Sequence, residues 1–366
     1  MGRSLKLYNF LIGLVLSSLM VACMSPNRPR ATQFPEPVGS PVAASPTQPA
    51  PTLSAPVEAT LLLETAASAT QPVSAATIAV ETQASPAESL FTNPPESVGA
   101  LLVENSRLRR RDVTYCTAEG VELKLDIFLP KQPLGVVPLV IYVHGGGWTE
   151  GDKRGGEGML DAPALLEAGF AFASLNYRLA PEYTFPAMIQ DIKCAIRFLR
   201  AHAGEYRIDP QNFGIYGASA GGHLVNMVGT TSPEAGFDVG EYLEQSSRVQ
   251  AVVDIYGPAD MTTDFSPTFV SLKPTVFPDF DLAAASPITH ITSDDPPFLI
   301  LQGDLDRIVP LAQSQLLYQR LLEAGVTVEL VIAVNGDHGF KTSNMQPTRP
   351  ELTDMIVDFF LTYLGP

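Results

Sequence analysis

Basic residues are scarce in this chain: 23 Lys and Arg stand against 39 Asp and Glu, which gives a formal net charge of −16. Nucleic-acid-binding proteins need basic surfaces to neutralise phosphates, so this composition argues against a nucleic-acid partner. The one basic cluster, Arg107–Arg111, is interpreted as a solvated approach to the first strand, with contact to a membrane surface as the alternative.

Cysteine and histidine are also rare, with three and five residues respectively. They are not spaced as metal ligands, and no glycine motif for a dinucleotide or a phosphate occurs, so we predict no metal and no cofactor. Cys116 ends a predicted strand and Cys194 lies within a predicted helix. We expect two buried free thiols, although an exported protein would permit a disulfide between them.

Aromatic residues are nearly absent from residues 26–98, which are rich in Pro, Ala, Ser and Thr. Such a segment cannot bury enough apolar surface to offset the entropy lost on ordering. Residues 24–98 are therefore interpreted as a disordered tether. The remaining residues, 99–366, have the size of a single α/β domain.

A long apolar run is missing at the N-terminus. The segment Phe10–Leu16 follows Arg3 and Lys6 and is short for a transmembrane helix, which is typical of a signal peptide. The ending Leu-Met-Val-Ala-Cys resembles a bacterial lipobox, so residues 1–23 are interpreted as a lipoprotein-type signal peptide with Cys23 lipidated. An ordinary cleaved signal peptide and an uncleaved anchor are the alternatives. All three predict an extracytoplasmic domain, and lipidation predicts attachment to a membrane.

Strands and helices alternate through the rest of the chain. Val121–Leu129 alternates apolar and charged side chains, as a half-buried strand does, and it forms a hairpin with Arg111–Cys116. Further strands are predicted at Pro138–Val143, Ala171–Asn176, Asn212–Tyr216, Ala251–Ile255, Phe298–Gln302 and Val326–Val331. Helices are predicted at Leu160–Ala168, Met188–Ala201, Ala220–Gly229, Leu311–Ala324 and Leu352–Leu364. This pattern predicts an α/β fold with a mostly parallel sheet of about eight strands, helices on both faces and a minimal cap at Pro258–Pro297, where no clear long helix is expected.

The motif G-x-S-x-G at residues 217–221 lies between a predicted strand and a predicted helix. In this context it predicts a nucleophile elbow, a sharp turn that exposes Ser219. Side chains at Gly217 and Gly221 would collide in so tight a turn. The helix N-terminus would stabilise negative charge that develops beside Ser219.

A serine nucleophile needs a base and an acid, which follow it in the chain in this fold. Only His290 and His338 lie far enough downstream. His338 follows a predicted strand at the carboxyl edge of the sheet, whereas no acid-bearing strand end precedes His290. We predict His338 as the base and Asp306 as the acid. Asp304 is the alternative acid, but it follows a turn glycine and is expected to cap that turn.

Three consecutive glycines directly follow a predicted central strand. Bare backbone N–H groups in such a loop can approach a substrate oxygen closely. Gly146, Gly147 and Ala220 are therefore predicted to form an oxyanion hole. His144 is expected to fix the loop through hydrogen bonds, and His223 is expected to be a packed residue instead of a second base.

Three motifs in this order resemble those of α/β-hydrolase esterases: GGGWTEGDK at 145–153, NYRLAP at 176–181 and GASAGG at 217–222. The resemblance is to esterases like hormone-sensitive lipase and to bacterial feruloyl and acetyl-xylan esterases (BD-FAE-like), and it covers about residues 111–364. It implies hydrolysis of carboxylic esters through an acyl-enzyme, with the predicted serine, aspartate and histidine at the matching catalytic positions.

The substrate expected from this resemblance is an ester with a short or aromatic acyl group, which a carbohydrate alcohol could carry. Trp148 is more similar to the carbohydrate-esterase and kynurenine-formamidase-like branches than to the lipase-like branch. Trp148, Tyr177 and Tyr183 could stack on sugar rings or on a phenolic acyl group, or they could pack inside their loops. The alternative functions are a lipase-like carboxylesterase, a kynurenine-formamidase-like amidase and a catalytically silent, lipid-tethered binding module.

Overall fold

The computed structural model describes residues 96–365 except residue 134. The predicted signal peptide, the predicted lipidation of Cys23 and the predicted tether as far as residue 95 lie outside the described residues. The first helix, α1 (Glu96–Asn105), has no counterpart among the predicted elements, and it begins inside the last residues of the predicted tether.

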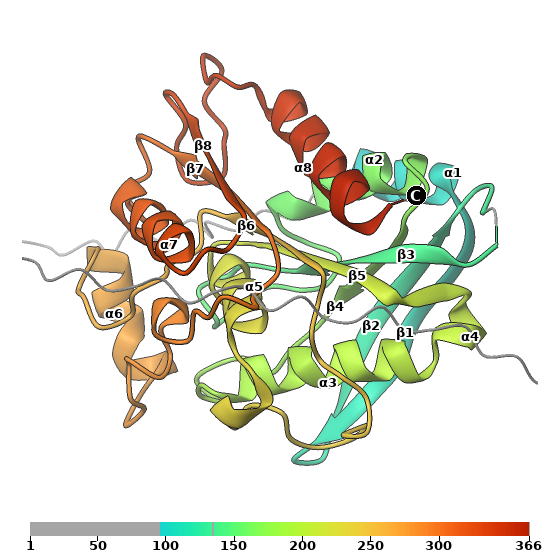
Figure 1. Ribbon diagram of the computed structural model, residues 1–366, viewed down its shortest axis with the longest axis horizontal. Coiled ribbons are helices and arrows are strands. Elements are labelled where there is room, and N and C mark those ends of the chain that lie inside the picture. The colour runs from blue at the N-terminus through green and yellow to red at the C-terminus, as the bar shows by residue number, and fades with distance from the viewer. Residues whose placement is uncertain (1–95, 134, 366) are drawn as a thin grey trace, which may run out of the picture. The chain divides into compact units, whose positions relative to one another are not determined.

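Eight strands form one mixed sheet in the order β1-β2-β4-β3-β5-β6-β7-β8, as Figure 1 shows. β2 pairs antiparallel with β1 and with β4, and the other pairings are parallel. The strands are β1 (Ser106–Ala118), β2 (Val121–Pro130), β3 (Val137–Val143), β4 (Ala171–Leu175), β5 (Ile208–Ala218), β6 (Ala251–Ile255), β7 (Phe298–Gly303) and β8 (Val328–Ala333). The predicted fold class is confirmed.

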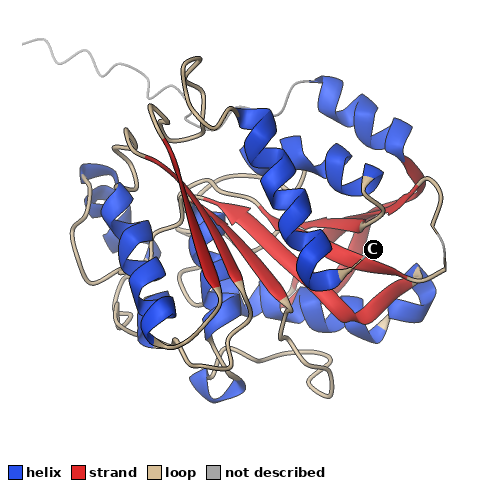
Figure 2. Cartoon of the chain, turned by 45° about the horizontal axis from the view of Figure 1, so that its top comes forward, coloured by secondary structure: helices blue, strands red, loops and turns tan. Residues whose placement is uncertain are grey.

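Helices cover both faces of this sheet, and α8 crosses one of them in Figure 2. The longer helices are α2 (Ala162–Glu167), α3 (Ala187–Ala201), α5 (Ala220–Thr230), α6 (Pro267–Val276), α7 (Leu311–Glu323) and α8 (Arg349–Leu364), and the short elements are α4 (Ala203–Tyr206), η1 (Glu157–Asp161), η2 (Pro233–Ala235) and η3 (Pro287–Thr289). No helix within the described part of the chain has the length and apolar character needed to cross a membrane.

Two apolar cores lie on opposite faces of the sheet, because successive side chains of a strand point in opposite directions. Leu139 and Ile141 of β3 pack in the core formed with α3, α5 and α7. Val140 and Tyr142 pack in the core formed with α2 and α8, which also holds Leu102 of α1. Burial on both faces explains why β3 is a continuous apolar run.

The first strand and the two cysteines differ from expectation. β1 already begins at Ser106, so Arg107–Arg111 belongs to the strand instead of leading into it. Cys116 and Cys194 form a disulfide with a Cα–Cα distance of 6.5 Å, so the prediction of free thiols is wrong. Helix α3 packs against β1 and brings Cys194 to Cys116. The sequence does not reveal which helix lies on which strand.

The segment Pro258–Pro297 contains α6, a helix of ten residues, contrary to the expectation of no clear long helix. Ser266 is its N-cap, and the Ser266 hydroxyl oxygen accepts a hydrogen bond from the Phe269 N–H at 3.2 Å. Pro267 occupies the first turn, where proline is tolerated. Pro274 lies within the helix, and because proline usually interrupts helices, the sequence of this segment did not predict one.

Candidate active site

Ser219 stands where β5 ends and the chain turns sharply into α5. Its φ and ψ angles are 58° and −119°, and its N–H donates a hydrogen bond to the Ile255 carbonyl oxygen at 2.9 Å. A Cβ on Gly217 would lie 2.5 Å from the Gly221 carbonyl oxygen, and a Cβ on Gly221 would overlap the Val143 carbonyl oxygen. The two glycines therefore permit the strained turn that the G-x-S-x-G motif predicts.

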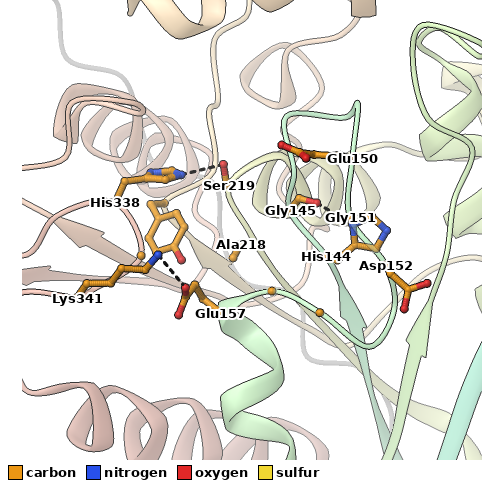
Figure 3. A pocket seen from close by; sticks show the side chains of 14 residues that line it. His144, Gly145, Glu150, Gly151, Asp152, Glu157, Ala218, Ser219, His338 and Lys341 are labelled. Carbon is orange, nitrogen blue, oxygen red and sulfur yellow. Dashed lines mark hydrogen bonds and ion pairs between the residues drawn. The ribbon is translucent and has the colours of Figure 1, made fainter. Parts of the chain in front are cut away.

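His338 connects Ser219 with Asp306. Nε2 of His338 lies 3.0 Å from Oγ of Ser219, a contact drawn in Figure 3. Nδ1 of His338 lies 2.7 Å from Oδ2 of Asp306. The carboxylate favours the tautomer with its proton on Nδ1, which leaves Nε2 free to accept a proton. The structure thus brings together the three side chains that the sequence selected.

Asp306 is held by the loop that follows β7. Its Oδ1 accepts hydrogen bonds from the backbone N–H groups of Ile308 and Val309 at 2.8 and 2.9 Å. These bonds hold the carboxylate in position for His338. Asp304 is exposed, and its N–H donates to the Ala333 carbonyl oxygen at 3.2 Å. The geometry therefore selects Asp306 over Asp304 as the partner of His338.

The ring of His338 rests against Tyr256, which the sequence did not single out. The two ring centres are 4.6 Å apart, and Phe340 packs against Tyr256 at 5.0 Å. Tyr256 follows β6 with a φ of 45°. Its turn is held by Asp254, whose Oδ1 accepts a hydrogen bond from the Gly257 N–H at 2.8 Å. A tyrosine at a strand end belongs to no motif, so the sequence carried no signal for it.

Asp254 is fully buried beneath the elbow. Burial raises its pKa to about 7, although hydrogen bonds from Asn226 and Gly257 act in the opposite direction. The Asn226 side-chain nitrogen donates to Oδ2 of Asp254 at 2.9 Å. A Cβ on Gly222 would lie 2.5 Å from Oδ1 of Asp254, so the carboxyl group fills the space between α5 and the turn that carries Tyr256.

The segment 144–151, which follows β3, is called the glycine loop. Gly146 and Gly147 have φ angles of 116° and 56°, which turn this loop back beside Ser219. The Gly146 carbonyl oxygen accepts a hydrogen bond from the Glu150 N–H at 3.0 Å. Within the residues that the structure describes, the N–H groups of Gly146, Gly147 and Ala220 have no acceptor. All three residues line the same pocket as Ser219. Their amides are available to bind an oxyanion.

His144 and Tyr177 stack behind the glycine loop, with ring centres 4.3 Å apart and planes 13° from parallel. The Tyr177 hydroxyl donates to the His144 carbonyl oxygen at 2.8 Å, and Nδ1 of His144 donates to the Gly145 carbonyl oxygen at 2.7 Å. Burial lowers the pKa of His144 to about 4, so its ring is neutral near pH 7. His144 holds the loop as expected. Of the two alternatives for Tyr177, the structure shows packing inside its loop, because its ring is buried against His144.

Trp148 and Tyr183 also pack against neighbouring side chains, although Trp148 still forms part of the pocket wall beside Ser219. Trp148 is 3% exposed, and its Nε1–H donates to Nδ1 of His223 at 3.2 Å. Nε2 of His223 donates to the Ala285 carbonyl oxygen at 2.7 Å, and burial lowers the pKa of His223 to about 4. His223 is thus a packed neutral residue, as expected. Tyr183 lies under the Arg178 guanidinium, 5.4 Å from it, and lines neither pocket beside the nucleophile.

The GDK and NYRLAP motifs meet behind the glycine loop. The Asn176 side chain accepts a hydrogen bond from the Lys153 N–H at 2.6 Å and donates to Oδ2 of Asp152 at 3.0 Å. The buried Lys153 ammonium group binds Oδ1 of Asp112 in β1 at 2.8 Å. These contacts anchor the glycine loop to Asn176 and to β1 of the N-terminal hairpin.

Two pockets meet at Ser219. The first, called the apolar pocket, has a volume of about 340 Å³ and reaches α6; its walls include Gly147, Trp148, Phe265, Phe269, Leu272 and Val309. The second, called the polar pocket, has a volume of about 290 Å³ and is drawn in Figure 3; its walls include Glu150, Asp152, Glu157, Tyr256, His338 and Lys341. Ser219 and Glu150 line both pockets.

The chemistry that this arrangement offers is that of a hydroxyl nucleophile beside a base and a set of amide donors. Among residues 96–365, residue 134 excepted, no group of three or more His, Cys, Asp or Glu side chains is arranged to hold a metal ion.

Comparison with known proteins identifies relatives for the catalytic domain. A family model described as BD-FAE matches residues 125–321, more than half of the chain. The probable carboxylic ester hydrolase LipM of Mycobacterium tuberculosis is 37% identical over 191 residues, which cover 50% of this chain and 44% of LipM. Esterase LipQ of the same organism is 34% identical over 213 residues, covering 56% and 50% of the two chains. The chain thus spans about half the length of these curated relatives.

Solved structures with the same fold include other esterases. A truncated carbohydrate esterase from gut microbiota superposes with a TM-score of 0.61 at 29% identity, covering 74% of this chain and 99% of that one. Est2, an esterase of Thermogutta terrifontis solved with bound butyrate, has a TM-score of 0.59 at 25% identity, with 72% and 96% covered. The match to the family model and the similarity to these structures agree on one family. The chain belongs to the BD-FAE family of α/β-hydrolase esterases.

Proposed function

We propose that this protein is a serine hydrolase that cleaves carboxylic esters through an acyl-enzyme intermediate. The observation that carries the proposal is the hydrogen-bonded chain from Asp306 through His338 to Ser219, beside three backbone amides that have no acceptor in the described part of the chain. The naming of the curated relatives as esterases supports the same activity.

In the proposed reaction, Nε2 of His338 accepts the hydroxyl proton of Ser219 as Oγ attacks the ester carbonyl carbon. Asp306 stabilises the resulting imidazolium, and the three amides bind the oxyanion. The imidazolium then gives its proton to the departing alkoxide. Water repeats the sequence on the acyl-enzyme and regenerates the free serine hydroxyl.

The position of the proton donor assigns one half of the ester to each pocket. The leaving alcohol has to receive its proton from Nε2 of His338, and His338 lines the polar pocket but not the apolar one. The amides that bind the oxyanion line the apolar pocket. The acyl group therefore occupies the apolar pocket and the alcohol occupies the polar pocket.

The acyl group is proposed to be short or aromatic. Helix α6 forms a wall of the apolar pocket close to the glycine loop, because a Cβ on Gly147 would lie 2.9 Å from the Leu272 side chain. Phe265 and Phe269 stack at 4.3 Å and supply an aromatic wall. The butyrate bound to Est2 supports a short acyl group, and the carbohydrate esterase among the similar structures supports a carbohydrate alcohol.

The experiment is a burst measurement followed by an acyl series of p-nitrophenyl esters. A burst of nitrophenol from the native protein, absent in Ser219→Ala, is expected. Acyl groups of C2–C4 should be turned over far faster than C12, and feruloyl or acetyl groups on xylan fragments should be released. An optimum at C8 or longer would instead identify a lipase-like carboxylesterase. Faster hydrolysis of N-formylkynurenine would identify an amidase, and no turnover of any substrate would favour a catalytically silent binding module.

The protein is further proposed to act outside the cytoplasm as a lipoprotein. The sequence features of residues 1–23 support this location, and the Cys116–Cys194 disulfide is typical of oxidising compartments. Mass spectrometry of the mature protein should find its first residue to be an acylated Cys23. A different cleavage site, or an unmodified Cys23, would contradict lipid anchoring.

A further inference from the structure

The polar pocket carries an excess of negative charge. Its walls hold three carboxylates, from Glu150, Asp152 and Glu157, and one ammonium group, from Lys341. If the proposed function is correct, this pocket receives the alcohol of the ester, so these charges act on the leaving group.

The one ammonium group in the wall is already engaged. Nζ of Lys341 lies 3.2 Å from Oε1 of Glu157, an ion pair visible in Figure 3. This pair links the loop that carries His338 to η1. An anionic leaving group would have to compete with Glu157 for Lys341, and it would gain no unpaired cation in the pocket.

Asp152 is charged but held in place. Burial opposes its ionisation, but hydrogen bonds from Asn176 and from the Arg154 N–H, together with the charge of Lys153, outweigh burial and lower its pKa. The carboxylate therefore contributes a fixed negative charge to the pocket. Each of its oxygens already accepts a hydrogen bond, Oδ1 from the Arg154 N–H and Oδ2 from the Asn176 side chain.

Glu150 differs from the other two carboxylates. It is exposed, it has neither an ion-pair nor a side-chain hydrogen-bond partner among the described residues, and it lines both pockets at their junction. In Figure 3 its carboxylate extends from the glycine loop toward Ser219. It is thus an unpaired carboxylate at the junction of the two pockets that Ser219 also lines.

We propose that the polar pocket selects leaving alcohols that carry a positive charge, such as amino alcohols, and that Glu150 is the residue that determines this selectivity. A cationic alcohol meets the unpaired Glu150 carboxylate and the fixed charge of Asp152, whereas an anionic alcohol is repelled by both. The net charge of −16 adds a long-range field of the same sign. The inference rests on the proposed function, because it assigns a chemistry to the alcohol side of the same site.

The test compares three acetate esters of similar size: acetylcholine, its neutral isostere 3,3-dimethylbutyl acetate, and the anionic 3-acetoxypropane-1-sulfonate. At low ionic strength, kcat/KM should be about tenfold higher for the cationic ester than for the neutral one, and lower again for the anionic one. Added salt should lower the ratio of kcat/KM for the cationic ester to kcat/KM for the neutral one, since screening weakens the attraction between the cation and the carboxylates. In Glu150→Gln the ratio of cationic to neutral ester should fall severalfold. The matched control is Glu323→Gln. It removes an exposed carboxylate on α7 that lines neither pocket, so the native ratio of cationic to neutral ester should be kept.

The outcomes separate the two claims. Turnover of the neutral ester that requires Ser219, with no preference for acetylcholine, would overturn the charge selectivity and leave the proposed function intact. A preference that Glu150→Gln and Glu323→Gln reduce equally would overturn the role of Glu150. Failure to hydrolyse any of the three esters and any p-nitrophenyl ester would overturn the proposed function itself.

Discussion

The apolar and polar pockets share Ser219 but are built from different parts of the chain. The polar pocket is lined by the glycine loop, η1 and the loop after β8, all within or beside segments that carry motifs or catalytic residues. The apolar pocket adds α6, which belongs to the segment between β6 and β7 and carries no motif. The catalytic groups therefore come from short, local motifs, whereas the wall proposed to receive the acyl group comes from a helix that carries none of these motifs.

The largest effect is expected where the two pockets meet. Ser219→Ala or His338→Ala should lower kcat by about 10⁴–10⁶-fold for every ester, whichever pocket the substrate fills more fully. Asp306→Asn should cost somewhat less, because it disturbs the tautomer of His338 without removing the base. Steady-state kinetics with p-nitrophenyl butyrate and circular dichroism of the folded variants measure this.

Asp304→Asn is the matched control for the acid, because Asp304 lies two residues from Asp306 and is exposed. It should retain nearly native turnover. Greater damage from Asp304→Asn than from Asp306→Asn would show that the acid has been assigned to the wrong residue.

A smaller effect, confined to the apolar pocket, is expected from shortening the α6 side chain that lies on the glycine loop. Leu272→Ala should raise the ratio of kcat/KM for octanoate over acetate esters by about tenfold, since it lengthens the space for the acyl chain. The preference among alcohols should stay unchanged. Val270→Ala on the same helix is the control, because Val270 is exposed and lines neither pocket. An equal change in both variants would contradict a wall formed by Leu272.

The smallest effect concerns Asp254, which lines neither pocket but supports the turn beneath both. Its folded-state pKa of about 7 lies above the ordinary value of 3.8, so the folded protein holds a proton that the unfolded chain releases. The contribution of Asp254 to stability therefore falls as pH rises from about 4 to about 7. In Asp254→Asn this titration is absent, so the Tm of the variant relative to the native protein should rise by a few degrees between pH 5 and pH 8.

Thermal unfolding at several pH values measures this difference in Tm. The buried His144 and His223 are present in both proteins, so their titration affects both Tm values equally and cancels in the difference. Asp358→Asn, which changes an exposed carboxylate of α8, should show no such trend. A Tm difference between Asp254→Asn and native protein that does not change with pH would contradict the elevated pKa.

The sequence predicted the sheet and the core of the site because both rest on local patterns. Continuous apolar runs such as that of β3 identify buried strands, and the glycines around Ser219 are required by the backbone of the turn itself. Asp306 and His338 were found because each follows a strand whose end lies at a known edge of the sheet. The order of strands and helices was therefore enough to predict that Ser219, Asp306 and His338 meet, although they are far apart in the sequence.

Features that depend on which side chain faces which neighbour were missed. Cys194 reaches Cys116 only because α3 packs on β1. Whether Tyr177 and Trp148 pack inside their loops stayed open, because no pattern in their own segments reveals their partners His144 and His223. Helix α6 was not predicted because its internal proline, Pro274, is typical of loops. Without this helix, the aromatic wall formed by Phe265 and Phe269 could not be predicted either.

The central claim is that Ser219 attacks an ester whose acyl group lies in the apolar pocket and whose alcohol lies in the polar pocket. A crystal structure after reaction with ethyl p-nitrophenyl butylphosphonate tests it most directly, because the butyl group mimics the acyl chain and the ethoxy group mimics the alcohol. The account predicts phosphorus bonded to Oγ of Ser219, its oxygen within hydrogen-bond distance of the Gly146, Gly147 and Ala220 amides, butyl beside Leu272 and ethoxy beside His338. Butyl in the polar pocket, or phosphorus bonded to another residue, would contradict it.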